Sequence, residues 1–480
     1  MLLDAAAADV AGQVVAASQL PSEAFRHGRI QNRPAVAANA RAVGFQYFRF
    51  GIGGAEKVTR ILLEQFRQAG RRAVLYVDEL VSAEEELELP EGVTCKVVPM
   101  EPRERAGFWM REVAEEKLCC VVYGTWLSPR APLDCLAIQA AGAALVLETH
   151  GAATYLFDCP RNGGRWDDML RCAYTADLMV CLSEADRLFW QTFNPNVRRV
   201  MNPIDPDTAA VLDACADAPS YDVVFCGRLD PHEKRPDQAL RVFAHARVIK
   251  PGIRMAFVGD GPARGGLEGL ADELGCSGDV DFLGFVGDPR PIVANAGVLV
   301  MSSPSEGCSL VISEAACLGT PLVAYEMPHL ANLAGNGGAV QVPQGDWEAG
   351  GSAVARILGD EGLRAQMSAA GRAFYRDALA SDQGPVWLGI VEDAVRIAAA
   401  GHESPEPQDD PLRALVFNAV AASRRESVRC EDFEDRMNAE WRRANEAEAQ
   451  LRALRESRSY RLAQALAGMA RKLKGLTGRG

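Results

Sequence analysis

Several features that would define other classes of protein are missing from this chain of 480 residues. No run of 18 or more apolar residues occurs, so no membrane-spanning helix is expected. The 13 cysteines contain no Cys-x-x-Cys pair, which disfavours a structural zinc site and predicts reduced thiols in a cytosolic protein. No Asp-x-Asp pair stands out as a metal site. The N-terminus has no basic segment, so no signal peptide is predicted. The formal net charge of −13 argues against a nucleic-acid-binding protein.

The charge that is present is unevenly distributed. Residues 451–480 hold eight basic residues and a single acid, a net charge of +7, which leaves −20 on residues 1–450. Apolar residues in the same tail recur at helical steps of four and three, at Leu462, Leu466, Met469, Leu473 and Leu476. A basic amphipathic helix at 455–480 predicts binding to an anionic membrane surface; docking on the protein itself or on a partner is the alternative.

Short apolar runs alternate with helical segments along most of the chain. One set covers residues 43–203 and a second covers 221–400, and the Asp-, Ala- and Pro-rich segment 204–220 interrupts the alternation. Such alternation is typical of parallel sheets with helices on both faces. We therefore predict an α/β fold with two doubly wound, Rossmann-like domains facing a cleft. The prediction includes the option that the last helix of the second domain crosses back to the first domain.

The remaining segments are harder to place. Residues 1–42 are expected to be a poorly defined leader, loosely attached or forming a short helix. The polar, Pro-rich segment 401–411 is expected to be a linker, and residues 412–480 a helical extension. The strands are expected at 43–50, 71–79, 93–100, 119–126, 144–151 and 177–183 in the first domain, and at 221–228, 253–261, 280–286, 297–303, 320–326 and 338–344 in the second.

Two carboxylates follow an expected strand of the second domain. Glu306 precedes Gly307 in a tight turn, and Glu314 lies in an apolar, helix-like run. Unpaired N–H groups and the dipole at a helix N-terminus attract anions. A phosphate there, flanked by two acceptors that grip hydroxyls, describes a sugar-nucleotide site, whereas two solvated surface carboxylates are the alternative.

The sequence GRLDPHEKR (227–235) follows the first strand of the second domain. Gly227 lets the backbone pass close to a ligand. Arg228 and Lys234 are placed to converge on one anion, where two cations would bind a diphosphate and stabilise the charge that grows as it leaves. A surface Arg and Lys on a loop are the alternative.

In combination these segments resemble the retaining, GT-B-fold glycosyltransferases of family 4, also called group 1 glycosyltransferases. The resemblance covers roughly residues 43–400. Its motifs, whose order and spacing the family shares, are GGAEKV (53–58), CLSEAD (181–186), NPID (202–205), GRLDPHEKR (227–235), FVGDGP (257–262), FLGFV (282–286), PSEGCSLVISEAACLGTPLVAYE (304–326) and VPQGD (342–346).

The resemblance implies roles for the matching residues. Arg228 and Lys234 would bind the donor diphosphate, and Glu306 would face the hydroxyls of the donor sugar. Glu314 would accept hydrogen bonds from the ribose hydroxyls. The other donor-binding candidates are Gly53, Gly54, Gly227, Phe285, Val286, Gly307, Cys308, Ser309 and Leu310.

His150 ends an expected strand at ETHG. A histidine at this place in relatives can hydrogen-bond the donor sugar, so His150 joins Arg228, Lys234 and Glu306 as a candidate catalytic residue; a histidine satisfied by neighbouring backbone is the alternative. Cys308 and Ser309 replace the aromatic residue and glycine that many relatives carry after Glu-Gly, which leaves the shape of the donor pocket open.

The function that the resemblance implies is a retaining, metal-independent, hexosyl-type glycosyltransferase without a cofactor. It would use a nucleotide-sugar donor and a glycan or lipid-linked acceptor, bind no nucleic acid, and act in cell-surface polysaccharide or glycolipid synthesis. It would be cytoplasmic or peripheral on the inner face of the membrane.

Other classes of protein remain as alternatives. A dehydrogenase would need GxGxxG and an acid about 20 residues on, which GIGGAEK (51–57) and GDGPARGG (259–266) only imitate. An epimerase or phosphorylase acting on sugar nucleotides shares the two-domain shape. A non-catalytic sugar-nucleotide-binding or scaffold protein would use the C-terminal helices as its working part.

Overall fold

The computed structural model describes residues 3–424, apart from 5–8, 27–29, 52, 81–88, 125–126, 159–164, 215–219, 380–381 and 407–410. The predicted membrane-binding helix at 455–480 lies outside these residues. The chain divides into two units, Met1–Tyr155 with Arg165–Phe417 and Leu156–Gly164 with Asn418–Gly480. In the second unit, residues 156–158, the end of α6 (Tyr155–Asp158), and residues 418–424 are helical. Both predicted sheets lie in the first unit.

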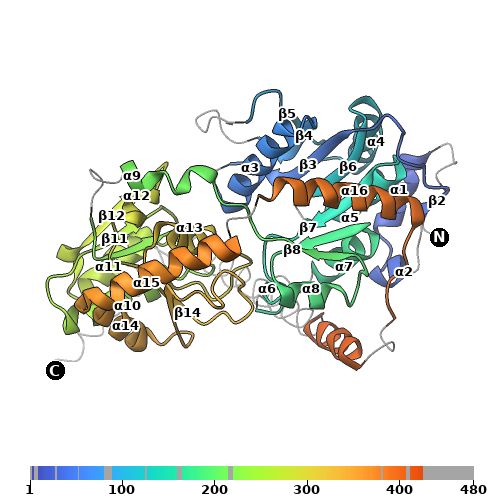
Figure 1. Cartoon of the computed structure of the whole chain (residues 1–480). Helices are drawn as coiled ribbons and strands as arrows, with labels where there is room; N and C mark the ends of the chain where they lie inside the picture. Colours follow the sequence, from blue (N-terminus) through green and yellow to red (C-terminus); the bar gives the residue numbers. More distant parts are fainter. Residues whose placement is uncertain are drawn as a thin grey trace, which may run out of the picture. The chain divides into compact units, whose positions relative to one another are not determined.

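A seven-stranded parallel sheet forms in the first half of this unit, in the order β5-β4-β3-β6-β7-β8-β9 (Figure 1). Central strands such as β6 are buried along their whole length, because helices cover both faces of the sheet. Its strands are β3 (Ala42–Arg49), β4 (Ala73–Glu79), β5 (Thr94–Val97), β6 (Leu118–Tyr123), β7 (Ala144–Glu148), β8 (Leu178–Cys181) and β9 (Val197–Arg199). Its helices are α3 (Gly54–Gln68), α4 (Pro102–Glu115), α5 (Ala131–Ala140), α7 (Trp166–Thr175) and α8 (Glu184–Trp190).

The N-terminal segment is attached more firmly than predicted. Helix α1 (Val10–Ser18) packs against α4 and α5, and α2 (Ser22–Arg26) packs against α7. Val14 and Phe25 are completely buried by these contacts. Two short strands, β1 (Leu3–Asp4) and β2 (Ile30–Gln31), pair with each other. This segment was expected to be loosely attached or to form a short helix; α1 and α2 are two short helices, and their apolar side chains cover helices of the first sheet.

A six-stranded parallel sheet forms in the second half, in the order β12-β11-β10-β13-β14-β15. Its strands are β10 (Val223–Cys226), β11 (Met255–Val258), β12 (Val280–Gly284), β13 (Val298–Met301), β14 (Leu322–Tyr325) and β15 (Ala339–Val342). Its helices are α10 (Pro236–Ile249), α11 (Arg264–Glu273), α12 (Arg290–Ala294), α13 (Leu310–Leu318), α14 (Trp347–Gly359) and α15 (Glu361–Phe374). Short helical turns connect them, namely η2 (Pro206–Thr208), α9 (Val211–Ala214), η4 (Ser277–Asp279) and η5 (Tyr375–Leu379).

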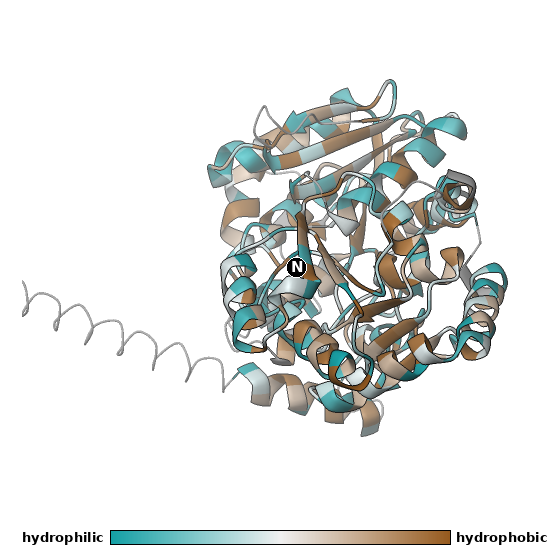
Figure 2. Ribbon diagram, turned by 90° about the vertical axis from the view of Figure 1, so that its left-hand side faces the viewer, coloured by the Kyte–Doolittle hydropathy of each residue, from teal (hydrophilic) through white to brown (hydrophobic). Residues whose placement is uncertain are grey.

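The predicted fold class is confirmed, since both sheets are parallel and flanked by helices. Hydrophobic strands lie between helices that carry both hydrophobic and hydrophilic residues (Figure 2). The strand order reverses at β3 in the first sheet and at β10 in the second. Ligands of such sheets bind beyond the carboxyl ends of the strands at this reversal. The loops that follow β3 and β10 are therefore the first places to look for a site.

The last long helix, α16 (Gly384–Ala400), returns to the first sheet. It packs against α3 and against β6, β7 and β8. Trp387, Ile390, Val391 and Ala394 belong to the same buried cluster as Phe66 of α3. The core of the first domain thus includes residues that follow the second domain in sequence.

Two further predictions concern the described residues as a whole. None of the helices there is long and apolar enough to cross a membrane. The ten cysteines among them are all free thiols.

Candidate active site

The turn after β10 carries Arg228 and Lys234, and Asp230 shapes it. The Asp230 carboxylate accepts hydrogen bonds from the backbone N–H groups of His232 and Glu233, each at 2.9 Å. Burial opposes ionisation, but these two hydrogen bonds prevail and lower the pKa of Asp230. The carboxylate therefore stays charged and folds the segment between the two cations into a compact turn.

Other backbone contacts hold this turn in place. Arg235 adopts a left-handed conformation with φ of 46°, and α10 begins at the next residue. The Ser302 hydroxyl, just past β13, lies 3.0 Å from the carbonyl oxygen of Lys234 and 2.8 Å from that of Arg235. On the other side, a Cβ on Gly259 would lie 2.1 Å from the carbonyl oxygen of Gly227. This contact requires glycine at position 259, whereas a Cβ on Gly227 itself would meet only the ring of Phe225, at 3.9 Å.

Lys234 and Glu306 form an ion pair across the ends of β10 and β13. The Lys234 ammonium donates a hydrogen bond to the Glu306 carboxylate, and the Glu306 side chain is only 12% exposed. The Arg228 side chain makes no hydrogen bond or ion pair with any residue that the structure describes. One cation of the turn is therefore neutralised, whereas the other retains its full capacity to bind an anion.

The backbone of the Glu306 loop is held from three directions. His329 Nε2 lies 3.0 Å from the carbonyl oxygen of Glu306. Asn332 donates to the carbonyl of Ser309 at 2.7 Å, and Asn202 donates to the carbonyl of Cys308 at 2.9 Å. Asn202 belongs to the NPID motif, for which the sequence indicated no role. Its hydrogen bond joins the segment between the two sheets to the candidate donor site.

Cys308 directly follows Glu306 and Gly307 in the loop. The side chain is buried, and burial raises the pKa of its thiol to about 11. The thiol is therefore neutral at pH 7 and acts as a small packing residue.

Gly307 brings the Glu306 loop against His150. A Cβ on Gly307 would lie 2.4 Å from the carbonyl oxygen of His150 and 2.8 Å from Cδ1 of Leu182. Its φ is not in the left-handed region, so glycine is required here for space and not for conformation. Two residues that the sequence nominated from separate sheets are thus in direct contact.

Glu314 is paired with a residue that the sequence did not nominate. Lys57 of α3 donates to the Glu314 carboxylate at 2.6 Å, and the Glu314 side chain is only 8% exposed. Lys57 lies in the GGAEKV motif, near the positive end of the dipole of α3, where a cation is unfavourable. A lysine in the first turn of a helix indicates that it pairs with an acidic residue outside that helix, and this signal in the sequence could have pointed to Glu314.

The other glycine and loop candidates are arranged as follows. Gly53 precedes α3 as its N-cap, and a Cβ on Gly54 would lie 3.8 Å from Leu310 of α13. The starts of α3 and α13 therefore face each other. Beyond β12, the Phe285 side chain is 59% exposed and Val286 is half-buried, so Phe285 presents an aromatic face to the outside.

The Lys57–Glu314 pair leads to a prediction on stability. Replacing Lys57 with Met should lower the free energy of unfolding by about 1–3 kcal/mol, because the buried Glu314 carboxylate loses its cation. The double variant Lys57→Met/Glu314→Gln should recover part of this loss. Thermal unfolding of these two variants and of Glu314→Gln alone measures the interaction free energy between Lys57 and Glu314. A double variant that is less stable than Lys57→Met would contradict it.

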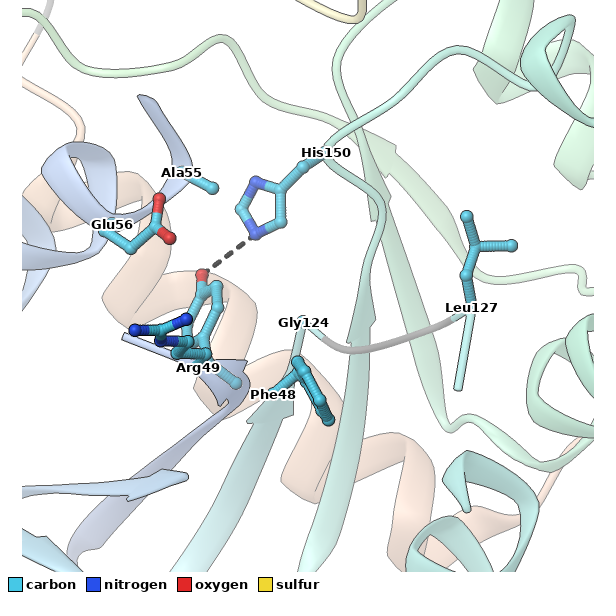
Figure 3. Close-up of a pocket in the computed structure, with 8 residues that line it drawn as sticks. Phe48, Arg49, Ala55, Glu56, Gly124, Leu127 and His150 are labelled. Atoms are coloured by element: carbon cyan, nitrogen blue, oxygen red, sulfur yellow. Dashed lines mark hydrogen bonds between the residues drawn. The ribbon is translucent and has the colours of Figure 1, made fainter. Parts of the chain in front are cut away.

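A cavity of about 380 Å³ opens beside His150 at the carboxyl ends of β3, β6 and β7 (Figure 3). Its lining combines aromatic, charged and small residues, namely Tyr47, Phe48, Arg49, Ala55, Glu56, Gly124, Leu127 and His150. His150 Nε2 lies 2.9 Å from the Tyr47 hydroxyl. Apart from His150, these residues were not nominated from the sequence. Ala55 and Glu56 lie in the GGAEKV motif at the start of α3, and the others come from the ends of separate strands, which no contiguous motif joins.

Within the described part of the chain, no group of three or more His, Cys, Asp or Glu side chains is arranged to hold a metal ion.

The comparisons with known proteins agree with this geometry. A model of the family "Glycosyl transferases group 1" matches residues 216–374. The lipopolysaccharide core biosynthesis glycosyltransferase LpsE of Rhizobium meliloti is 38% identical over 177 residues, which cover 35% of this chain and 50% of LpsE. A D-inositol 3-phosphate glycosyltransferase of Streptomyces scabiei is 34% identical over 198 residues, covering 37% of this chain and 44% of that protein. The chain thus spans about half the length of these curated relatives or less.

Solved structures extend the likeness to both sheets. HepE of Anabaena in complex with UDP has a TM-score of 0.59 at 18% identity, and the match covers 73% of this chain and 98% of HepE. WaaG, a glycosyltransferase involved in lipopolysaccharide biosynthesis, has a TM-score of 0.58 at 15% identity, covering 75% of this chain and 100% of WaaG. At such identities the likeness concerns the fold. Residues 216–374 therefore match the group 1 glycosyltransferases, and the two sheets have the GT-B fold of these solved structures.

Proposed function

We propose that this protein transfers a hexosyl group from a nucleoside-diphosphate sugar to an acceptor hydroxyl, with retention of the anomeric configuration and without a metal ion. The reaction would serve cell-surface polysaccharide or glycolipid synthesis. LpsE and WaaG, whose names refer to lipopolysaccharide biosynthesis, support this setting.

The observation that carries the proposal is the grouping of Arg228, Lys234 and Glu306 at the ends of β10 and β13. Of the two cations of the turn, Arg228 is the one that makes no hydrogen bond or ion pair with a described residue, so it would bind the donor diphosphate first. Lys234 would reach both the diphosphate and Glu306. Glu306 would then orient the hydroxyls of the donor sugar next to the leaving group.

In the proposed reaction, the acceptor hydroxyl attacks from the side of the leaving group. A phosphate oxygen of the donor takes the proton of that hydroxyl, so no carboxylate nucleophile is needed. Arg228 and Lys234 offset the negative charge that develops on the departing diphosphate. Glu314 accepts from the ribose hydroxyls, which requires it to share its carboxylate between the ribose and Lys57. Phe285 offers its exposed face to the base.

The cavity beside His150 would receive the acceptor. Aromatic side chains next to ionic ones suit a sugar, which has apolar faces and a rim of hydroxyls. Phe48, which is 41% exposed, supplies an aromatic side chain, and Glu56 supplies a carboxylate to the same cavity. A glycan or lipid-linked sugar is therefore the proposed acceptor.

A screen of nucleotide-sugar donors tests the proposal. The purified chain is incubated with each donor, and release of the nucleoside diphosphate is measured with and without glycan acceptors. UDP-glucose comes first in the screen, because HepE has been solved with UDP-glucose bound. An Arg228→Ala variant serves as the matched control. If no donor is hydrolysed or transferred, and none shifts the melting temperature, the proposed function is wrong.

Chelation provides a separate prediction. Transfer should continue at an unchanged rate in excess EDTA, because the proposal assigns the charge of the diphosphate to Arg228 and Lys234 and not to a cation. Initial rates with EDTA, and with added Mg²⁺ or Mn²⁺, measure this. Activity that disappears with EDTA and returns with one of these ions would contradict the metal-independent mechanism.

A further inference from the structure

A buried chain of hydrogen bonds stands behind His150. The Tyr47 hydroxyl lies 2.9 Å from His150 Nε2, 3.3 Å from the Glu148 carboxylate and 2.5 Å from the Thr59 hydroxyl. His150 Nε2 is also 3.4 Å from the Glu148 carboxylate. Tyr47, Glu148 and Thr59 are 6%, 1% and 0% exposed, so their polar groups are shielded from solvent. The other ring nitrogen of His150, Nδ1, is buried and has no partner in the described structure.

Counting protons selects one arrangement of this chain. An ionised Glu148 can only accept, and the two donors within its reach are the Tyr47 hydroxyl and His150 Nε2. Tyr47 has a single proton. If Tyr47 donates its proton to His150, Nε2 carries no proton of its own. Glu148 then has no donor, and a buried carboxylate without a hydrogen bond costs free energy.

One arrangement gives Glu148 its donors and leaves only Nδ1 of His150 without a partner. Thr59, whose hydroxyl also lies 3.0 Å from the carbonyl oxygen of Ala55, donates to the Tyr47 oxygen together with the His150 Nε2–H, and Tyr47 donates to Glu148. Glu148 fixes the direction of the Tyr47 hydrogen bond, and its carboxylate also lies close to Nε2 itself. His150 then carries its proton on Nε2, and Nδ1 is left as a hydrogen-bond acceptor.

We infer that Glu148 is a positioning residue that, directly and through the Tyr47 hydroxyl, holds His150 in the Nε2–H tautomer, so that Nδ1 accepts a hydrogen bond from a hydroxyl of the bound sugar. The part that concerns the sugar rests on the proposed function, whereas the tautomer does not. The competing arrangement has a protonated Glu148 that donates to Tyr47, Tyr47 that donates to Nε2, and the histidine proton on Nδ1. Burial raises the pKa of Glu148, which is why the two arrangements need a direct test.

The test measures the ring ¹⁵N chemical shifts of histidine in the full chain at pH 8, with His150 assigned through the signal lost in His150→Gln. The wild type should show the Nε2–H tautomer. Glu148→Met removes the acceptor of the Tyr47 proton, which then turns to Nε2, so His150 should change to the Nδ1–H tautomer. Tyr47→Phe should keep Nε2–H, because Nε2 can donate to Glu148 directly. An Nδ1–H tautomer or an imidazolium in the wild type overturns the inference even if a variant fails to fold.

Kinetic measurements with the donor test the proposed hydrogen bond between Nδ1 of His150 and the bound sugar. Glu148→Met should lower kcat/KM about tenfold, the loss expected when one hydrogen bond to the sugar is made poorly.

Glu112 offers a matched control, since it is a second buried carboxylate of the first domain and accepts from Tyr76 at 2.9 Å. Glu112→Met should change neither the His150 tautomer nor kcat/KM. An unchanged tautomer in Glu148→Met, or an equal kinetic loss in Glu112→Met, contradicts the inference. A tautomer that changes as expected in a chain with no transferase activity refutes the proposed function and leaves the tautomer assignment intact.

Discussion

Replacing Lys234 with Ala should lower kcat about 100- to 1,000-fold while the protein remains folded. This is the loss typical of removing one preorganised group that stabilises charge in the transition state. Lys234 is placed for that task, because its ammonium already contacts Glu306 and its backbone is tied to Ser302 at the end of β13. Affinity for the nucleoside diphosphate should fall much less, since the proposed contact of Arg228 with the diphosphate would remain.

Two companions make this result specific. Lys234→Arg keeps the charge but changes the donor geometry, so it should recover only part of the activity. Lys250→Ala changes the residue that follows the other end of α10 and should leave kcat unchanged. Circular dichroism and thermal unfolding of each variant separate a catalytic loss from a folding defect. A wild-type kcat for sugar transfer in Lys234→Ala would contradict the role assigned to this turn.

A single methyl group on Gly307 should have a comparable effect. In Gly307→Ala, the new Cβ would meet the carbonyl oxygen of His150 at 2.4 Å, so one of the two backbones must move. The required movement separates His150 from the loop that carries Glu306. A displacement of about 1 Å at a reacting centre costs on the order of 100-fold in rate, and kcat should fall by about that much.

Gly278→Ala is the matched control for this steric effect. No atom lies within 4 Å of a Cβ at Gly278, and its φ is not in the left-handed region. Its activity should equal that of the wild type. The melting temperature of Gly307→Ala should fall by only a few degrees, because the contact joins two loops and lies outside the hydrophobic clusters of the two sheets. A Gly307→Ala enzyme with wild-type kcat would show that this close contact is dispensable.

The fold was largely predictable from the sequence because parallel strands buried on both faces are continuous apolar runs. A segment such as CCVVY in β6 can be identified as a buried strand from its own residues, without knowledge of the strands beside it. The three-residue strand β9 was missed, since it is short and two of its residues, Arg198 and Arg199, are exposed. Helix α1 was underestimated for a related reason, because an Ala-rich face reveals its packing only when α4 and α5 are in place.

The candidate site was predictable only where its chemistry is local in sequence. The Arg228 turn and the Glu306 loop are contiguous motifs, and their roles stay predictions until they are measured. Lys57 and Tyr47 were missed because their importance comes from partners more than 100 residues away, Glu314 and His150. Such pairs are set by the meeting of strand ends, which the order of the sheets determines and a linear motif does not record.

Helix α16 has a consequence for exchanging parts between relatives. An obvious chimera would join residues 1–220 of this chain to the nucleotide-side half of another glycosyltransferase. That exchange would also replace Trp387, Ile390 and Val391, which complete the buried cluster around Phe66 of the opposite half. The foreign helix would have to fit a core with which it did not evolve, at a cost of several kcal/mol for each poorly filled large side chain. Modular shuffling in this protein therefore requires two junctions, one near residue 220 and a second just before α16.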